Sequence, residues 1–191
     1  RTTNVYAKSK TLAEQAAWDF IKKDTTGMEL STVLPAMVFG PILEEDFGVS
    51  VGAILDMMNG KYPIVPNWDM GVVDVRDVAS LELLAMTKPE AAGQRFVCSA
   101  ENMFMKDQNE YLSEIFPESA SKIPKRVAPN WLIKFLALFL PALKMIAEGL
   151  GKERSMDSSR ARNLLGWNPR SAKEAIKSAA ESAKEFGLIE N

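Results

Sequence analysis

A helix followed directly by a short apolar strand constrains the fold of this chain more than any other feature. The pattern predicts a helix over 5–23, with Gly27 suited to cap its end. A β-branched strand is expected over 29–34, and its apolar run continues to a loop signal at Gly40-Pro41. A helix joined to a strand by a tight loop is half of a βαβ unit, which predicts an α/β fold. The loop after the strand would lie at its carboxyl end, where open α/β sheets bind ligands.

Further elements are expected at intervals along the rest of the chain. The pattern predicts helices over 49–58, 77–86, 107–116, 158–165 and 172–186, and short strands over 72–75 and 94–98. Asp77 is expected to cap the second of these helices, and Asp107 with Glu110 to form a capping box for the third. Ser171 and Glu174 form an S-x-x-E capping box before the last helix. The apolar stripe predicted for that helix is Ala172, Ala175, Ile176, Ala179, Ala180, Ala183 and Phe186. In helix 5–23, small and apolar side chains form a stripe suited to close packing: Ala13, Ala16, Ala17, Phe20 and Ile21.

Composition excludes several classes of site. The formal net charge is −2 over 191 residues and no basic stripe stands out, so phosphate neutralisation gives no support for nucleic acid binding. The chain has no histidine and a single cysteine, Cys98, which excludes an intrachain disulfide and a zinc cluster. The absence of histidine also excludes Ser-His-Asp and Cys-His nucleophilic machinery. We expect no metal site and a cytoplasmic location, because the first residues show no signal-peptide pattern.

An apolar stretch at 131–146 resembles a membrane segment at first sight. It is shorter than the roughly 20 apolar residues that a span needs, and Lys134, Pro141 and Lys144 interrupt it. We therefore expect no membrane span and a buried or pocket-lining pair of helices. A helix lying on a membrane surface is the alternative.

Tyr6 and Lys10 are four residues apart in the predicted first helix, so they share one face. An ammonium close to a phenol favours the phenolate and lowers a pKa that is ordinarily near 10. A tyrosine tuned in this way can pass a proton to or from a reacting oxygen near neutral pH. The alternative is an unrelated tyrosine and lysine on a solvated surface.

Four segments in order resemble one enzyme family. They are Val5-Tyr6-Ala7-Lys8-Ser9-Lys10-Thr11-Leu12-Ala13-Glu14, Leu34-Pro35-Ala36-Met37-Val38-Phe39-Gly40-Pro41, Val73-Asp74-Val75-Arg76-Asp77-Val78-Ala79 and Leu164-Leu165-Gly166-Trp167-Asn168-Pro169-Arg170-Ser171. Together they are similar to the C-terminal part of extended short-chain dehydrogenases/reductases, the superfamily of NAD-dependent epimerases and dehydratases. The sequence around Tyr6 is most similar to that of the dihydroflavonol 4-reductase-like and aldehyde reductase branch of this superfamily.

The resemblance implies a role for individual residues. Tyr6 would donate the proton to a carbonyl oxygen, and Lys10 would lower its pKa and bind the ribose of NADP or NAD, with NADP favoured. Two further sets follow from the resemblance: cofactor contacts at Pro35, Ala36, Val38 and Ser50, and a substrate wall at Phe39, Met57 and Trp68. Each of the last three is also interpretable as a plain core residue. Arg76 is either an anion clamp or a structural neighbour of the Asp77 cap, and we favour the structural interpretation.

The implied fold is the C-terminal portion of a Rossmann-type doubly wound parallel sheet plus a smaller, mostly helical α/β substrate domain. Residues 1–41 would end the NAD(P)-binding domain, and 42–191 would be mostly substrate domain, with 72–98 returning to the Rossmann-type core. No G-x-x-G-x-x-G or G-x-G-x-x-G occurs in the sequence, so no loop of the usual kind cradles a pyrophosphate. We therefore expect a fragment of a longer enzyme that is inactive alone.

Three functions stay open at this point. The first is an NAD(P)-dependent oxidoreductase that reduces the carbonyl of a small-molecule aldehyde or ketone to an alcohol by hydride transfer. The second is a nucleotide-sugar epimerase or dehydratase, which shares the Tyr-Lys pair. The third is a non-enzymatic truncated or oligomerisation module, in which an exposed helix 5–23 would drive association or homodimer formation.

Overall fold

Helices and strands alternate through the computed structural model, which describes residues 5–140, 142–153 and 155–190. In chain order the elements are α1 (Val5–Ile21), β1 (Thr32–Pro35), β2 (Met37–Phe39), α2 (Val49–Met58), β3 (Val65–Pro66), β4 (Asp69–Asp74), α3 (Val75–Thr87), the 3₁₀ turn η1 (Pro89–Ala91), β5 (Arg95–Cys98), β6 (Glu101–Phe104), α4 (Met105–Ile115), β7 (Val127–Ala128), α5 (Asn130–Leu136), α6 (Ala142–Gly149), α7 (Ser159–Leu165) and α8 (Ala172–Glu185). The predicted α/β class is confirmed. Strands β3, β6 and β7 were not predicted, because none of the three carries a run of β-branched residues.

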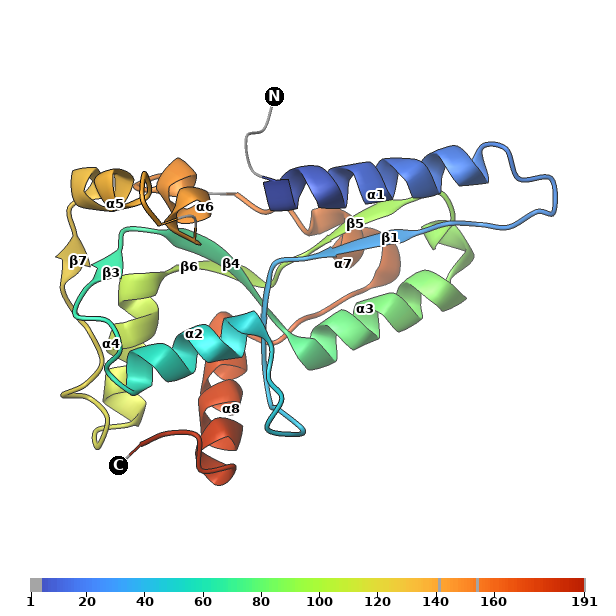
Figure 1. The fold of residues 1–191 in the computed structure, drawn as a ribbon. Coiled ribbons are helices and arrows are strands. Elements are labelled where there is room, and N and C mark those ends of the chain that lie inside the picture. Colours follow the sequence, from blue (N-terminus) through green and yellow to red (C-terminus); the bar gives the residue numbers. More distant parts are fainter. Residues whose placement is uncertain (1–4, 141, 154, 191) are drawn as a thin grey trace.

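The strands form three small sheets. β1 pairs in parallel with β5, and β3 pairs in parallel with β7. In the third sheet β4 lies between β2, which runs parallel to it, and β6, which runs antiparallel. Helix α1 lies on one side of β1 and β5 and α3 lies on the other, as Figure 1 shows. Helices on both sides of parallel strands are the arrangement expected of a doubly wound sheet.

Two buried clusters divide the core. The larger one surrounds β2 and β4, against which α2 and α8 pack, and α4 joins it through α8 and β6. The alanine stripe predicted for the last helix is confirmed except at Phe186, which is exposed: Ala172, Ala175, Ile176, Ala179, Ala180 and Ala183 are all buried. The smaller cluster surrounds β5 and includes Phe96, Leu165 and Trp167. Cys98 belongs to it, and burial raises the pKa of its thiol to about 12, so it behaves as a small buried hydrophobe.

Two predicted helix caps are wrong. Asp74, not Asp77, caps α3: its carboxylate Oδ1 accepts a hydrogen bond from the backbone N–H of Arg76 at 2.9 Å. The helix starts earlier than predicted because β4 ends at Asp74 and the chain turns at once. Helix α4 begins at Met105 after Phe104, whose side chain makes no capping bond, so Asp107 lies inside its first turn. The Ser171 cap is confirmed, since its Oγ accepts from the N–H of Glu174 at 3.2 Å.

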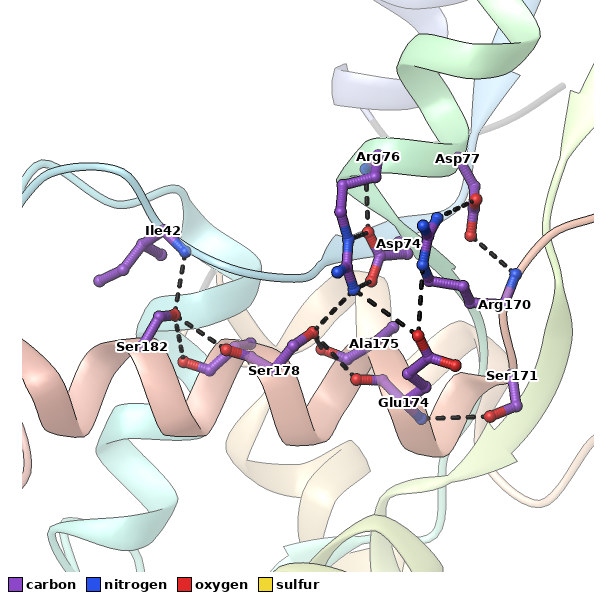
Figure 2. Close-up of polar contacts among 11 residues, drawn as sticks. Ile42, Asp74, Arg76, Asp77, Arg170, Ser171, Glu174, Ala175, Ser178 and Ser182 are labelled. Carbon is purple, nitrogen blue, oxygen red and sulfur yellow. Dashed lines mark hydrogen bonds and ion pairs between the residues drawn. The ribbon is translucent and has the colours of Figure 1, made fainter.

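A polar network joins the start of α3 to α8 (Figure 2). The guanidinium of Arg76 donates from Nη2 to Asp74 Oδ2 at 2.6 Å and to Ser178 Oγ on α8 at 3.3 Å. Asp77 is buried and accepts from the Nη1 and the backbone N–H of Arg170, at 2.6 and 2.8 Å. This geometry supports the structural interpretation of Arg76.

The apolar stretch at 131–146 forms α5, a turn and α6. Ile133 is buried in a small cluster with Ala128 and Leu150, whereas much of the stretch is exposed. Burial of this helix pair was therefore predicted wrongly for much of the stretch. Among the described residues, no helix combines the length and the apolar character that crossing a membrane requires.

Candidate functional site

Tyr6 and Lys10 lie one turn apart on the same face of α1. The Nζ atom of Lys10 is 5.7 Å from the centre of the Tyr6 ring, which confirms the spacing argument. Both side chains are exposed, with Tyr6 at 64% of its full accessible area. The pair is therefore open to a molecule that approaches from solvent.

Glu14 holds this helix against the strands, a role that the sequence analysis missed. Its Oε1 accepts from Arg95 Nε at 2.7 Å and from Thr32 Oγ1 at 2.8 Å, and its Oε2 accepts from Arg95 Nη2 at 3.0 Å. The hydrogen bonds from Arg95, and then those from Thr32 and Trp18, lower the pKa of Glu14 from 4.5 to about 2. Glu14 lies four residues after Lys10 on the same face of the helix, and this spacing was the sequence signal that could have indicated its role.

The face of α1 that meets the strands differs from the predicted stripe. Half-buried side chains on the helix include Ala7, Glu14, Ala17, Trp18 and Ile21, and no described residue of α1 is fully buried. The predicted stripe is therefore correct at Ala17 and Ile21 and wrong at Ala13, Ala16 and Phe20, which are exposed. An apolar pattern could not include the charged Glu14, although it bonds to both Thr32 and Arg95.

The anchor at Glu14 places Tyr6 near the carboxyl end of β1. Tyr6 precedes Glu14 by about two helical turns, or roughly 12 Å of helix. Pro35 follows Thr32, the partner of Glu14, by roughly 10 Å of strand. Because α1 and β1 run in opposite directions (Figure 1), both distances lead the same way, and Tyr6 and Pro35 reach the same level.

The chain changes sheets at Ala36. Pro35 is the last residue that pairs with β5, the N–H of Ala36 donates to the carbonyl of Cys98 at 3.0 Å, and Met37 then pairs with β4. A Cβ atom at Gly71 would overlap the Met156 sulfur and would lie 3.0 Å from the Cβ of Ala36. Ala36, Gly71 and Met156 therefore lie in contact where the chain passes from one sheet to the other. Nothing in the sequence predicted that Met156, which is distant along the chain, would lie here.

The remaining predicted site residues are spread over the fold. Pro35 is exposed, while Ala36, Val38 and Ser50 are half-buried, the last in the first turn of α2. Phe39, Met57 and Trp68 are buried in the larger core cluster. The structure thus places Tyr6, Lys10, Pro35 and Ala36 at one end of β1, and it does not bring the three substrate-wall candidates to an open surface.

Two hollows on the described part of the chain are lined by no predicted site residue. One is lined by Gln15, Trp18, Asp19 and Lys22 on α1. The other is lined by side chains that include Asp69, Asn102, Asp107, Glu153 and Lys173. Among the described residues no group of three or more acidic, histidine or cysteine side chains is placed to hold a metal ion.

The chain is similar to known reductases over most of its length. The NADPH-dependent methylglyoxal reductase GRE2 of Saccharomyces cerevisiae is 30% identical over 96% of this chain and 52% of its own length. A crystal structure of yeast Gre2 complexed with NADPH, 28% identical, superposes with a TM-score of 0.72 over 96% of this chain and 52% of that one. Cinnamoyl-CoA reductase CAD2 of Medicago truncatula is 36% identical over 65% of this chain and 36% of its own length.

The chain is homologous to the C-terminal part of extended short-chain dehydrogenases/reductases. It spans about half the length of the curated reductase GRE2 that it matches. A nucleoside-diphosphate-sugar epimerase from Pseudomonas aeruginosa, 19% identical, shares the fold alone, with a TM-score of 0.73 over 94% of this chain and 55% of that one. No protein-family model matches the chain.

Proposed function

We propose that this chain is the C-terminal part of an NADPH-dependent reductase that converts the carbonyl of a small aldehyde or ketone to an alcohol. The observation that carries the proposal is the Tyr6–Lys10 pair, exposed on α1 at the level where β1 ends. Ligands of open α/β sheets bind at the carboxyl ends of strands. The relatives that match the chain are named as NADPH-dependent or carbonyl-reducing enzymes, which favours NADPH over NADH.

The residues at the end of β1 fit the nicotinamide and ribose end of this cofactor. Ala36 offers a small side chain beside the exposed Pro35, so a flat ring can approach the backbone there. Lys10 would hold the ribose, and Pro35, Ala36 and Val38 would line the ring, with Ser50 as a further contact. The sequence holds no Gly-rich loop for the pyrophosphate, so these residues account for part of a cofactor site.

Tyr6 would act as the general acid. When bound, NADPH supplies the hydride that reduces the carbonyl carbon. Tyr6 gives its phenolic proton to the carbonyl oxygen, which becomes the alcohol hydroxyl, and the phenolate that remains is stabilised by the ammonium of Lys10. The phenolate regains its proton from solvent, to which Tyr6 is open. The burial of Phe39, Met57 and Trp68 supports their interpretation as core residues rather than as a substrate wall.

The division into domains stays a proposal on the same basis. Residues 1–41 would end the cofactor-binding domain, and 72–98 would return to it. This is supported by the pairing of β1 with β5 and by the contact of α3 with β1. The cytoplasm as the compartment stays a prediction.

Substitution of Tyr6 in the full-length parent enzyme tests the activity. We expect Tyr6→Phe to lower kcat/KM for NADPH-dependent reduction of methylglyoxal and aromatic aldehydes by about 10²–10⁴, the usual contribution of a general acid. Lys10→Met should lower it similarly. Tyr62→Phe is the matched control, since Tyr62 is exposed on another part of the chain and bonds only to Asp56 among the contacts seen. Full activity of Tyr6→Phe would refute the proposal, and turnover of nucleotide sugars without aldehyde reduction would favour the epimerase alternative.

Self-association through α1 is the second part of the proposal. Leu12 and Phe20 are exposed large apolar residues on this helix, and exposed apolar faces promote contact between copies. Sedimentation velocity of the 191-residue chain should show concentration-dependent association that Leu12→Glu/Phe20→Glu abolishes. A stable monomer at all concentrations would contradict this part alone and would leave the reductase assignment untouched.

A further inference from the structure

The outer side of α5 and the turn that follows it form an exposed apolar surface, which we call the 131–140 surface. Trp131, Phe135 and Leu138 recur at helical spacing and are 68%, 53% and 72% exposed. Phe139 is 69% exposed, and its ring meets that of Phe135 edge-on with the centroids 5.5 Å apart. The opposite side of the same segment is buried through Ile133 and Ala137. The segment therefore has apolar side chains both on its buried side and on its solvent-exposed side.

The 131–140 surface lies outside the site proposed above. Helices α5 and α6 sit together at one corner of the molecule, over β3 and β7, in the upper left of Figure 1. None of its four exposed aromatic and leucine side chains lines either of the two hollows described above. A convex cluster of this kind is suited to a broad partner rather than to an enclosed small molecule.

The sequence around the 131–140 surface carries charge of one sign. Between Glu118 and Glu148 it holds five basic residues and no acidic residue, although the whole chain has a net charge of −2. Of the five, Lys122 points elsewhere and donates to the carbonyl of Glu190, which leaves Lys125, Arg126, Lys134 and Lys144 for this surface. Lys134 stands within the apolar stripe itself, and Lys144 is exposed on α6, which contacts α5. Lys125 and Arg126, just before β7, are exposed as well. A partner that covers this surface must accept aromatic side chains and offer negative charge.

We propose that the 131–140 surface docks on a membrane surface that contains anionic phospholipid. Tryptophan and phenylalanine insert at the boundary between headgroups and acyl chains, and lysines beside them reach the phosphates through their flexible stems. A second copy of the chain fits less well, because a symmetric contact through this surface would bring together two copies of a segment whose charged side chains are all basic. The inference concerns a different surface from Tyr6 and Lys10 and does not depend on the reductase activity.

Co-sedimentation with large unilamellar vesicles tests the proposal. The 191-residue chain is expected to bind vesicles of phosphatidylcholine with about 30% phosphatidylserine and to bind phosphatidylcholine alone at least about tenfold more weakly. Lys134→Glu/Lys144→Glu should lower the partition coefficient about 30-fold or more, and Trp131→Ser/Phe135→Ser should abolish binding. These side chains are exposed, so the substitutions leave the core intact. Binding should also shift Trp131 fluorescence to shorter wavelength.

Lys23→Glu/Lys177→Glu is the matched control, because it makes the same change in charge on α8 and after the far end of α1. It should bind like the unchanged chain. Equal binding to both vesicle types, no binding, or loss of binding in the control to the same extent would overturn the proposal. Binding by the 191-residue chain but not by its full-length parent would also overturn it, since the rest of the parent would then cover the surface.

Discussion

Glu14 ties the helix that carries Tyr6 and Lys10 to the strands beside it. Its carboxylate joins Thr32 at the start of β1 and Arg95 at the start of β5, and its side chain is only 16% exposed. Both strands thus share one acidic partner on α1. A residue in this position acts on Tyr6 through geometry, because rotation or withdrawal of α1 would move the phenol away from the end of β1.

Glu14→Gln should loosen this contact in a pH-dependent way. The pKa of Glu14 is lowered to about 2, so the carboxylate stabilises the fold above about pH 4.5, and this contribution is lost as the pH falls from there towards 2. Since Arg95 is half exposed, we expect a loss of about 1–2 kcal/mol in the free energy of unfolding at pH 7. Urea unfolding at pH 7 and pH 3 measures it. Glu45→Gln, in an exposed loop, is the control, and an equal loss at both pH values would contradict the explanation.

At the scale of elements, Asp77 connects α3 to the turn that precedes α8. Its carboxylate accepts hydrogen bonds from the side chain and from the backbone N–H of Arg170. Its backbone carbonyl accepts a hydrogen bond from the indole Nε1 of Trp167 at 2.9 Å. The motif around Gly166-Trp167 and the motif around Asp77 resembled the same family separately. The structure shows that they are two sides of one contact, which holds the C-terminal helix against the sheet.

Asp77→Ala should therefore destabilise the fold strongly. The substitution leaves Arg170 without its buried partner, for which we expect a loss of about 2–3 kcal/mol, less than for a fully buried pair because Arg170 is partly exposed. Asp107→Ala is a matched control: Asp107 is the third residue of α4, as Asp77 is of α3, but it is exposed. Thermal and urea unfolding of both variants provide the comparison. Similar losses for the two would show that the helix position, and not the ion pair, matters.

Helix starts show why element boundaries were only partly predictable. Asp74 and Asp77 are three residues apart, and either can cap a helix by local rules. The choice depends on where β4 stops pairing with β2, and Phe39 pairs with Asp74 at that point. Ser171 had no such competitor, so its capping box was predicted correctly. Local patterns decide a boundary when only one candidate residue is present.

At the scale of the whole molecule, the chain carries the proposed proton-transfer pair, and its sequence contains no Gly-rich loop for the pyrophosphate. The isolated 191 residues should bind NADPH with a Kd above about 1 mM, because most of the charge of the cofactor would find no cradle of backbone N–H groups. Isothermal titration or NADPH fluorescence measures this. The full-length parent should bind far more tightly, and micromolar binding by the 191 residues would show that a phosphate site exists in them after all.

Sequence alone determined the local features on which the proposed chemistry rests. The spacing of Tyr6 and Lys10, the alanine stripe of α8 and the Ser171 cap are local, so periodicity was enough to predict them. Tertiary structure decided what those elements face. The switch of the chain between sheets at Ala36, the anchoring of α1 by Glu14 and the exposure of Trp131 and Phe135 all depend on partners distant in sequence. A helical stripe has the same pattern whether it meets a sheet, a second protein or a membrane, and only the packed structure shows which side is left open.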